Sequence, residues 1–192
     1  MTTDTQTQQR TEWAIDSSHS QAEFTVKHMM ITKVRGRFSD LDGTIVLDRE
    51  NPGSSEVRVE IAAASIDTRE EDRDNHLRSG DFLNAEEYPA LTFESTRVEG
   101  LELEEGSEFK VIGDLTIRGT TKEVELDAKF EGRGQDPWGN QRVAFSAETK
   151  IDRRDFGLTW NQALETGGVL VGHEVAIHLE AQAIPADAGD ES

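Results

Sequence analysis

Early in the chain, between residues 21 and 28, apolar and polar residues alternate. Phe24, Val26 and His28 fall on one face of this stretch, and polar side chains occupy the positions between them. A period of two is typical of a β-strand that has one face against the protein interior and the other in water. The pattern therefore predicts a half-covered strand near the start of the chain.

The same alternation recurs along most of the remaining sequence. Further runs lie at residues 34–38, 57–63, 91–94, 109–118, 123–130, 143–147 and 175–183. We expect an all-β fold of about eight strands, arranged as an antiparallel meander that closes into a barrel, because closure removes exposed strand edges. A barrel of this size encloses either packed side chains or one small ligand, and alternation alone does not distinguish the two.

One connection between two of these runs predicts a strand register. Gly119-Thr120 is typical of a two-residue hairpin loop of type II′, which has glycine at its first position. This loop would place Leu115 opposite Val124 and Phe109 opposite Phe130, so that apolar side chains face one another across the pair.

Residues 68–80 are the main exception to the β pattern. Thr68 and Glu71 have the spacing of a helix capping box, and Gly80 suits the position after a helix C-terminus. Leu77 is the only strongly apolar side chain within the segment. We therefore expect a short surface helix that caps one end of the barrel, held there by Leu77 and by Ile66, Phe82 and Leu83 nearby.

The length and composition indicate a single domain. The chain has 192 residues and no cysteine, which excludes disulfides and thiolate chemistry. We expect the barrel to occupy residues 12–184, between a polar, disordered segment at 1–11 and an acidic, flexible tail at 185–192.

The net charge of −19 argues against one class of partner, because so acidic a surface repels the phosphate backbone of nucleic acids. The acidity suits either a high-salt habitat or an ordinary acidic protein. No apolar run approaches the ~20 residues of a membrane-spanning helix, so no stable membrane insertion is expected. The N-terminus lacks the apolar core of a secretory signal, which predicts a cytoplasmic protein, or a periplasmic one if the chain is a processed form.

The five histidines do not form a recognisable metal site. The nearest two, His173 and His178, are five residues apart and fall on opposite faces of one run. Ser18 and His19 lie next to each other near Asp16, but neighbours in sequence do not make a catalytic triad, and no Gly-x-Ser-x-Gly motif occurs. We therefore predict no metal, no cofactor and no catalytic residue.

A set of short motifs appears in a characteristic order. It includes Trp-Ala-Ile-Asp-Ser-Ser-His-Ser at 13–20 and Arg-Asp-Phe-Gly at 154–157, with further segments at 24–28, 36–38, 65–68, 73–82, 88–96, 113–119 and 172–175. In this order the set resembles the YceI-like family over roughly residues 13–183. The resemblance implies an elongated, lipocalin-like barrel with a long apolar channel. Family members bind long-chain lipids, many are periplasmic, and they often form dimers, so a homodimer is a candidate assembly.

By this resemblance, the chain binds, sequesters or transports a polyisoprenoid, an isoprenoid quinone or a fatty-acid derivative, and is not an enzyme. The predicted ligand-binding residues share the inward face or lie in the capping segments: Phe24, Val26, His28, Phe38, Val59, Ile61, Phe82, Phe93, Leu115, Phe145, Phe156, Trp160 and Ile177. Arg73, Arg78 and Arg154 are candidates for an anionic headgroup.

The sequence leaves two alternatives open. One is a hydrolase or isomerase that acts on an apolar substrate with His28 as acid–base. The other is a structural or stress-related barrel whose interior is filled by side chains.

Overall fold

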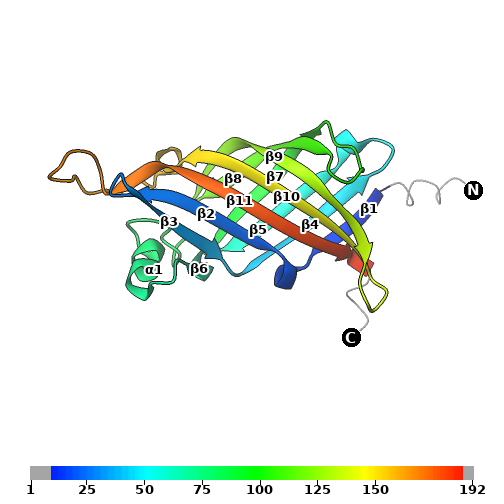
Figure 1. The fold of residues 1–192 in the computed structure, drawn as a ribbon, viewed down its shortest axis with the longest axis horizontal. Helices are drawn as coiled ribbons and strands as arrows, with labels where there is room; N and C mark the ends of the chain where they lie inside the picture. The colour runs from blue at the N-terminus through cyan, green and yellow to red at the C-terminus, as the bar shows by residue number, and fades with distance from the viewer. Residues whose placement is uncertain (1–9, 188–192) are drawn as a thin grey trace, which may run out of the picture.

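The computed structural model describes residues 10–187, which form an elongated β-barrel (Figure 1). Its strands are β1 (Arg10–Ile15), β2 (Gln21–His28), β3 (Thr32–Phe38), β4 (Leu41–Asp48), β5 (Glu56–Ala62), β6 (Ile66–Asp67), β7 (Ala90–Glu99), β8 (Glu108–Ile117), β9 (Thr120–Gln135), β10 (Gln141–Asp152) and β11 (Val171–Pro185). The helices are α1 (Glu71–Arg78) and four short 3-10 turns, η1 (Ser17–His19), η2 (Pro52–Ser54), η3 (Ala63–Ser65) and η4 (Arg153–Phe156).

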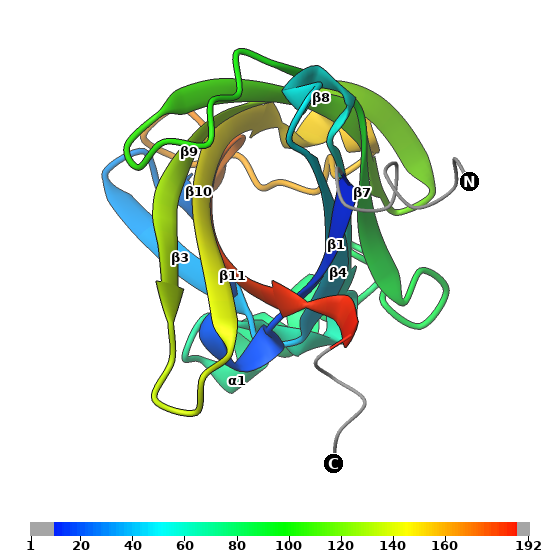
Figure 2. The ribbon, with the colours of Figure 1, turned by 90° about the vertical axis from the view of Figure 1, so that its right-hand side faces the viewer.

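The barrel wall is an antiparallel meander closed on itself. β1 and β2 act as one strand interrupted by η1, because β11 pairs with both. In the same sense β3 and β4 form one interrupted strand of the wall, and β5 and β6 form another. Counted so, the wall has eight strands, and the pairing of Trp13 with Pro185 closes the ring. Figure 2 shows this ring end-on. The predicted all-β barrel of eight strands with one helix is confirmed.

The predicted register of the β8–β9 hairpin is wrong by two residues. The loop is Arg118-Gly119, and Leu115 faces Lys122 instead of Val124. Both loop residues have positive φ, 49° and 73°, as a type I′ turn requires, and such turns match the right-handed twist of the strands. The prediction placed Gly119 at the first loop position because a type II′ turn has glycine there, whereas Arg118 is an uncommon residue for positive φ. A shift of two preserves which side chains face inward.

The N-terminus of α1 also differs from the prediction. The residue that caps it is Glu70, whose carboxylate accepts hydrogen bonds from the backbone N–H groups of Asp72 and Arg73. Thr68 lies before the helix, and its backbone N–H donates to the buried carboxylate of Asp74 at 2.8 Å. Thr68 therefore anchors the first turn of the helix from outside it.

The two ends of the barrel each have a packed cluster. The terminal end, where residues 10 and 185 lie, is filled by a first cluster that includes Trp13, Leu47 and Phe130. At the α1 end, a second cluster of Ile66, Leu83, Leu91, Ile117, Phe156 and others lies under the helix, with Leu77 packed against it. The helix therefore covers this end of the barrel.

The boundaries of the barrel extend slightly past the predicted ones. β1 begins at Arg10, and β11 ends at Pro185. Residues 1–9 of the predicted disordered segment and 188–192 of the predicted tail lie outside the described residues. Within residues 10–187 there is no helix of the length and apolarity needed to cross a bilayer.

Candidate functional site

An apolar cavity lies inside the barrel, and members of both clusters, such as Leu47 and Ile66, are part of its wall. Its volume is about 270 Å³, counted as space open to the centre of a water-sized sphere. A single water needs only about 10–15 Å³ on this measure, so the space is much larger than a packing defect. Inward-facing side chains such as Val59, Leu115 and Ile177 line this space and are only partly buried, although Val59 and Leu115 also pack against the first cluster.

Most of the predicted ligand-binding residues lie in the cavity wall. These are Phe24, Val26, Phe38, Val59, Ile61, Phe82, Phe93, Leu115, Phe145 and Ile177. All but Phe82 come from strands, where the alternation had placed them on one face. Further wall residues that the prediction omitted, among them Ala147, Val175, Leu179 and Ala181, have the same parity in β10 and β11.

Three predicted residues lie elsewhere. His28 is the last residue of β2, opposite Val171 of β11, and is not part of the cavity wall. Phe156 belongs to η4 and is 2% exposed in the second cluster, so it fills the end of the barrel. Trp160 packs edge-on against the His76 ring at 4.6 Å between ring centroids, close to α1.

Two of the proposed headgroup arginines stabilise the α1 segment. Arg73 donates to the hydroxyl and the carbonyl oxygen of Thr68. Arg78 donates to the carbonyl oxygens of Ala64 and Ile66. Neither side chain is in the cavity wall. Both hold the crossing from β6 into the helix.

Arg154 also points away from the cavity. It forms a surface ion pair with Asp152, through Nη2 at 2.6 Å and Nε at 3.0 Å, and these bonds lower the pKa of Asp152 to about 2. Its neighbour Arg153 is the arginine in the cavity wall, and it is 3% exposed. The alternation of the sequence could have identified Arg153, because Ile151 faces the cavity and residue 153, two positions later, shares that face.

The guanidinium of Arg153 is held by backbone carbonyl oxygens alone. Nε donates to Gly172, Nη1 to Leu158 and Trp160, and Nη2 to Val171, at distances between 2.6 and 3.2 Å. Among residues 10–187 no carboxylate forms an ion pair with it, and burial lowers its pKa. Arg153 therefore ties the 153–170 loop to the start of β11 and leaves one positive charge beside the cavity.

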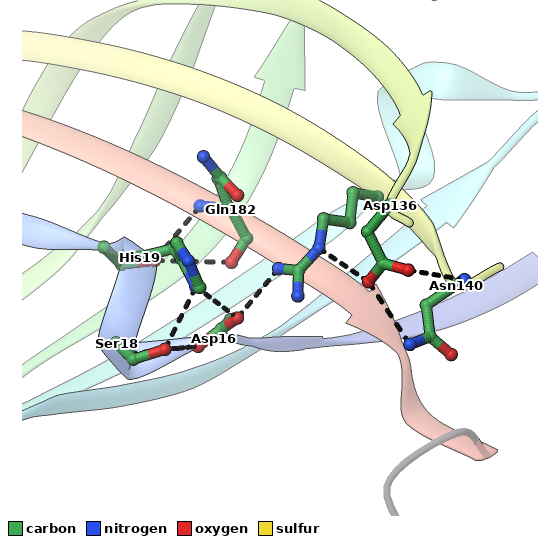
Figure 3. A network of polar contacts seen from close by, with 8 residues as sticks. Asp16, Ser18, His19, Asp136, Asn140 and Gln182 are labelled. Carbon is green, nitrogen blue, oxygen red and sulfur yellow. Dashed lines mark hydrogen bonds and ion pairs between the residues drawn. The ribbon is translucent and has the colours of Figure 1, made fainter. Parts of the chain in front are cut away.

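A polar network fixes the corner between β1 and β2 (Figure 3). Arg142 of β10 donates to Asp16 at 2.8 Å and to Asp136 at 3.2 Å, and so joins η1 to the β9–β10 turn. Burial raises the pKa of both carboxyl groups, but their hydrogen bonds, including those from Arg142, together lower it by more. The net pKa of each group therefore lies below its usual value.

The Asp16, Ser18 and His19 side chains meet in this network without forming a catalytic relay. Both the Ser18 hydroxyl and the Asp16 carboxylate contact Nδ1 of His19, at 3.0 and 2.8 Å. In a triad the two partners use opposite ring nitrogens, so that the base can pass a proton between them. The arrangement is therefore a structural turn.

The part of the chain that the structure describes offers no group of three or more His, Asp or Glu side chains that could hold a metal. All five histidines lie within it, and none is in the cavity wall. The cavity thus presents aliphatic and aromatic surface, with Arg153 as its one buried charge among the described residues.

Comparison with known proteins identifies the family. The sequence profile of the YceI-like domain matches residues 13–183. The chain belongs to the YceI-like family. Protein YceI of Escherichia coli O157:H7 is 43% identical over 143 residues, which cover 74% of this chain and 73% of that protein.

Solved structures share this YceI-like barrel. Burkholderia cenocepacia BcnA superposes with a TM-score of 0.73 at 21% identity, over 88% of this chain and 98% of the other. A polyisoprenoid binding domain from Saccharophagus degradans, implicated in plant cell wall breakdown, superposes with a TM-score of 0.68 at 13% identity, over 90% and 98%. At these identities the likeness concerns the fold.

Proposed function

We propose that this YceI-like protein binds one long-chain apolar lipid in its cavity and sequesters or carries it, without chemistry of its own. The class we infer is a polyisoprenoid, an isoprenoid quinone or a fatty-acid derivative. The observation that carries the proposal is the row of partly exposed apolar side chains facing an interior space. Among these three classes, the name of the Saccharophagus degradans domain supports a polyisoprenoid.

The composition of the wall selects for an apolar occupant. Each methylene-sized group moved from water into such a wall is worth about 0.8 kcal/mol, so a long chain binds tightly without many polar contacts. A polar ligand would lose its hydrogen bonds to water and find few replacements there. The wall therefore favours length and apolarity over a particular headgroup.

The enzymatic alternative with His28 as acid–base is not favoured by the geometry. His28 lies at the end of β2 outside the cavity wall, so it does not face the proposed ligand. We expect His28→Ala to bind lipid as the unaltered protein does. An activity toward an apolar ester or alkene that disappears in this variant would restore the alternative.

The proposal is tested by organic extraction of the protein purified without detergent, followed by mass spectrometry of the extract. We expect one long-chain lipid per chain. If the protein is empty, it is incubated with an isoprenoid alcohol, an isoprenoid quinone and a long-chain fatty acid in turn. Failure to bind any of them would overturn the proposal and support a barrel without cargo.

A further inference from the structure

The turn between β2 and β3 exposes three consecutive apolar side chains. Met29, Met30 and Ile31, here called the β2–β3 tip, are 46%, 55% and 81% exposed. The backbone N–H of Met29 donates to the carbonyl oxygen of Leu170 at 2.7 Å, which joins the tip to the 153–170 loop. Figure 1 shows both segments extending beyond the barrel wall at the same end.

The backbone of the tip is unfavourable for the residues it carries. Met29 and Met30 have φ values of 53° and 66°, and the N–H of Ile31 donates to the carbonyl oxygen of His28. Two successive residues with positive φ are the setting in which Asn-Gly is preferred, and side chains such as methionine are strained there. The Met30 side chain lies against Gly168 of the 153–170 loop, but Met29 and Met30 both remain about half exposed, so this packing accounts for only part of the choice of methionine.

The strands that lead into the tip bear unpaired positive charge. Lys27 and Lys33 are directly opposed, and Arg35 lies on the same outer face. Like charges in opposed positions destabilise a strand pair. No carboxylate in residues 10–187 forms an ion pair with these three side chains, whereas Lys110 on β8 pairs with both Glu125 and Asp127. Three neighbouring cations without ion-pair partners among the described residues are unusual in a chain of net charge −19.

We propose that the β2–β3 tip binds the surface of a lipid bilayer that contains anionic lipids. Met29, Met30 and Ile31 enter the interfacial region, and Lys27 and Lys33 contact lipid phosphates. An apolar tip flanked by lysines is the arrangement by which peripheral proteins attach to such surfaces. The side chains project from a turn and do not line a groove, which favours a deformable surface over a folded partner.

The acidity of the whole chain does not prevent this contact. At physiological ionic strength the Debye length is about 8 Å, so charges at the contact outweigh distant ones. The tip also lies next to the cavity, because His28 pairs with Val171, a wall residue. The inference goes beyond the proposed function, since it concerns an outer surface and holds whether or not the cavity contains lipid.

The test is flotation of the whole protein with vesicles of phosphatidylcholine alone, or of phosphatidylcholine and phosphatidylglycerol in equal parts. We expect binding to the mixed vesicles that weakens as salt is raised. Met29→Asn/Met30→Gly/Ile31→Thr should lower the bound fraction at least tenfold, and it suits the turn better than the natural residues. Lys27→Gln/Lys33→Gln should weaken binding about fivefold for each lysine.

Two variants serve as matched controls. Lys110→Gln removes a lysine that is already paired with carboxylates, and Trp138→Ser removes an 82% exposed apolar side chain at the opposite end of the barrel. Both should bind vesicles as the unaltered protein does. Absence of binding to mixed vesicles, or equal binding by the tip variant, would overturn the proposal. So would loss of binding in Trp138→Ser alone. Each readout is independent of cargo binding.

Discussion

The ring of Phe24 on β2 lies directly over Gly36 on β3. The two residues are opposed in the strand pair, and a Cβ atom at residue 36 would lie 2.3 Å from Cζ of the ring. The glycine thus leaves the space in which Phe24 lies across the sheet, tilted against Phe38 with ring centroids 5.7 Å apart. Because Phe24 is a wall residue, this contact shapes the cavity.

Gly36→Ala should therefore move Phe24 and destabilise the protein. We expect the free energy of unfolding to fall by about 1–3 kcal/mol, the usual cost of forcing extra volume into a packed site. Urea denaturation measures this change. Gly134→Ala is the matched control, because a Cβ atom at that β9 position meets nothing within 4 Å. Equal stability of the two variants would show that Phe24 does not depend on the glycine.

Arg153 should matter far more for stability than its neighbour Arg154. Arg153→Gln removes donors from one buried and three partly buried carbonyl oxygens, and we expect the free energy of unfolding to fall by about 3 kcal/mol. Arg153→Lys should rescue little, since one ammonium cannot reproduce the planar fork of donors. Arg154→Gln breaks only an exposed ion pair and should leave the denaturation midpoint nearly unchanged. Comparable losses in the two glutamine variants would contradict this account.

Stability should decline in acid through the network around Arg142. The folded pKa values of Asp16 and Asp136 lie below the ordinary aspartate value of about 3.9, although burial alone would raise them. A lowered folded pKa gives stability that is present above the unfolded value and is lost as pH falls through the folded value. We therefore expect the urea midpoint to drop steadily below about pH 4.

Arg142→Gln should reduce stability at pH 7 and flatten this acid dependence, because the two carboxyl groups lose a donor that favours their charged form. The control is Arg58→Gln, which removes an exposed ion pair with Glu94. An unchanged pH profile in the Arg142 variant would mean that other groups control the acid response.

The inner face of the barrel was predictable from sequence because a strand places alternate residues on one side. Val26, Val59 and Ile177 were assigned to that face and lie in the wall. Alternation could not tell the cavity wall from packed core, since Phe130 obeys the same parity and is 1% exposed. That difference depends on how far apart opposite strands lie, which only the closed ring determines.

The hairpin register, the helix cap and the roles of the arginines could not be predicted from the sequence pattern, because each depends on the conformation of single residues. The hairpin register depends on the positive φ of Arg118, a backbone conformation that few residues other than glycine adopt. Glu70 caps the N-terminus of the helix, although threonine is the more usual capping residue. Arg153 and Arg154 differ in role because one faces the cavity and the other the solvent.

Native mass spectrometry of two tryptophan variants tests most directly whether the cavity holds a lipid. Ala181→Trp fills the cavity from β11, whereas Ala176→Trp places the same side chain on the opposite face of the same strand. We predict a stoichiometric lipid adduct on the unaltered protein and on Ala176→Trp, and none on folded Ala181→Trp. Equal adducts on both variants, or no adduct on any form after loading with lipid, would contradict the account.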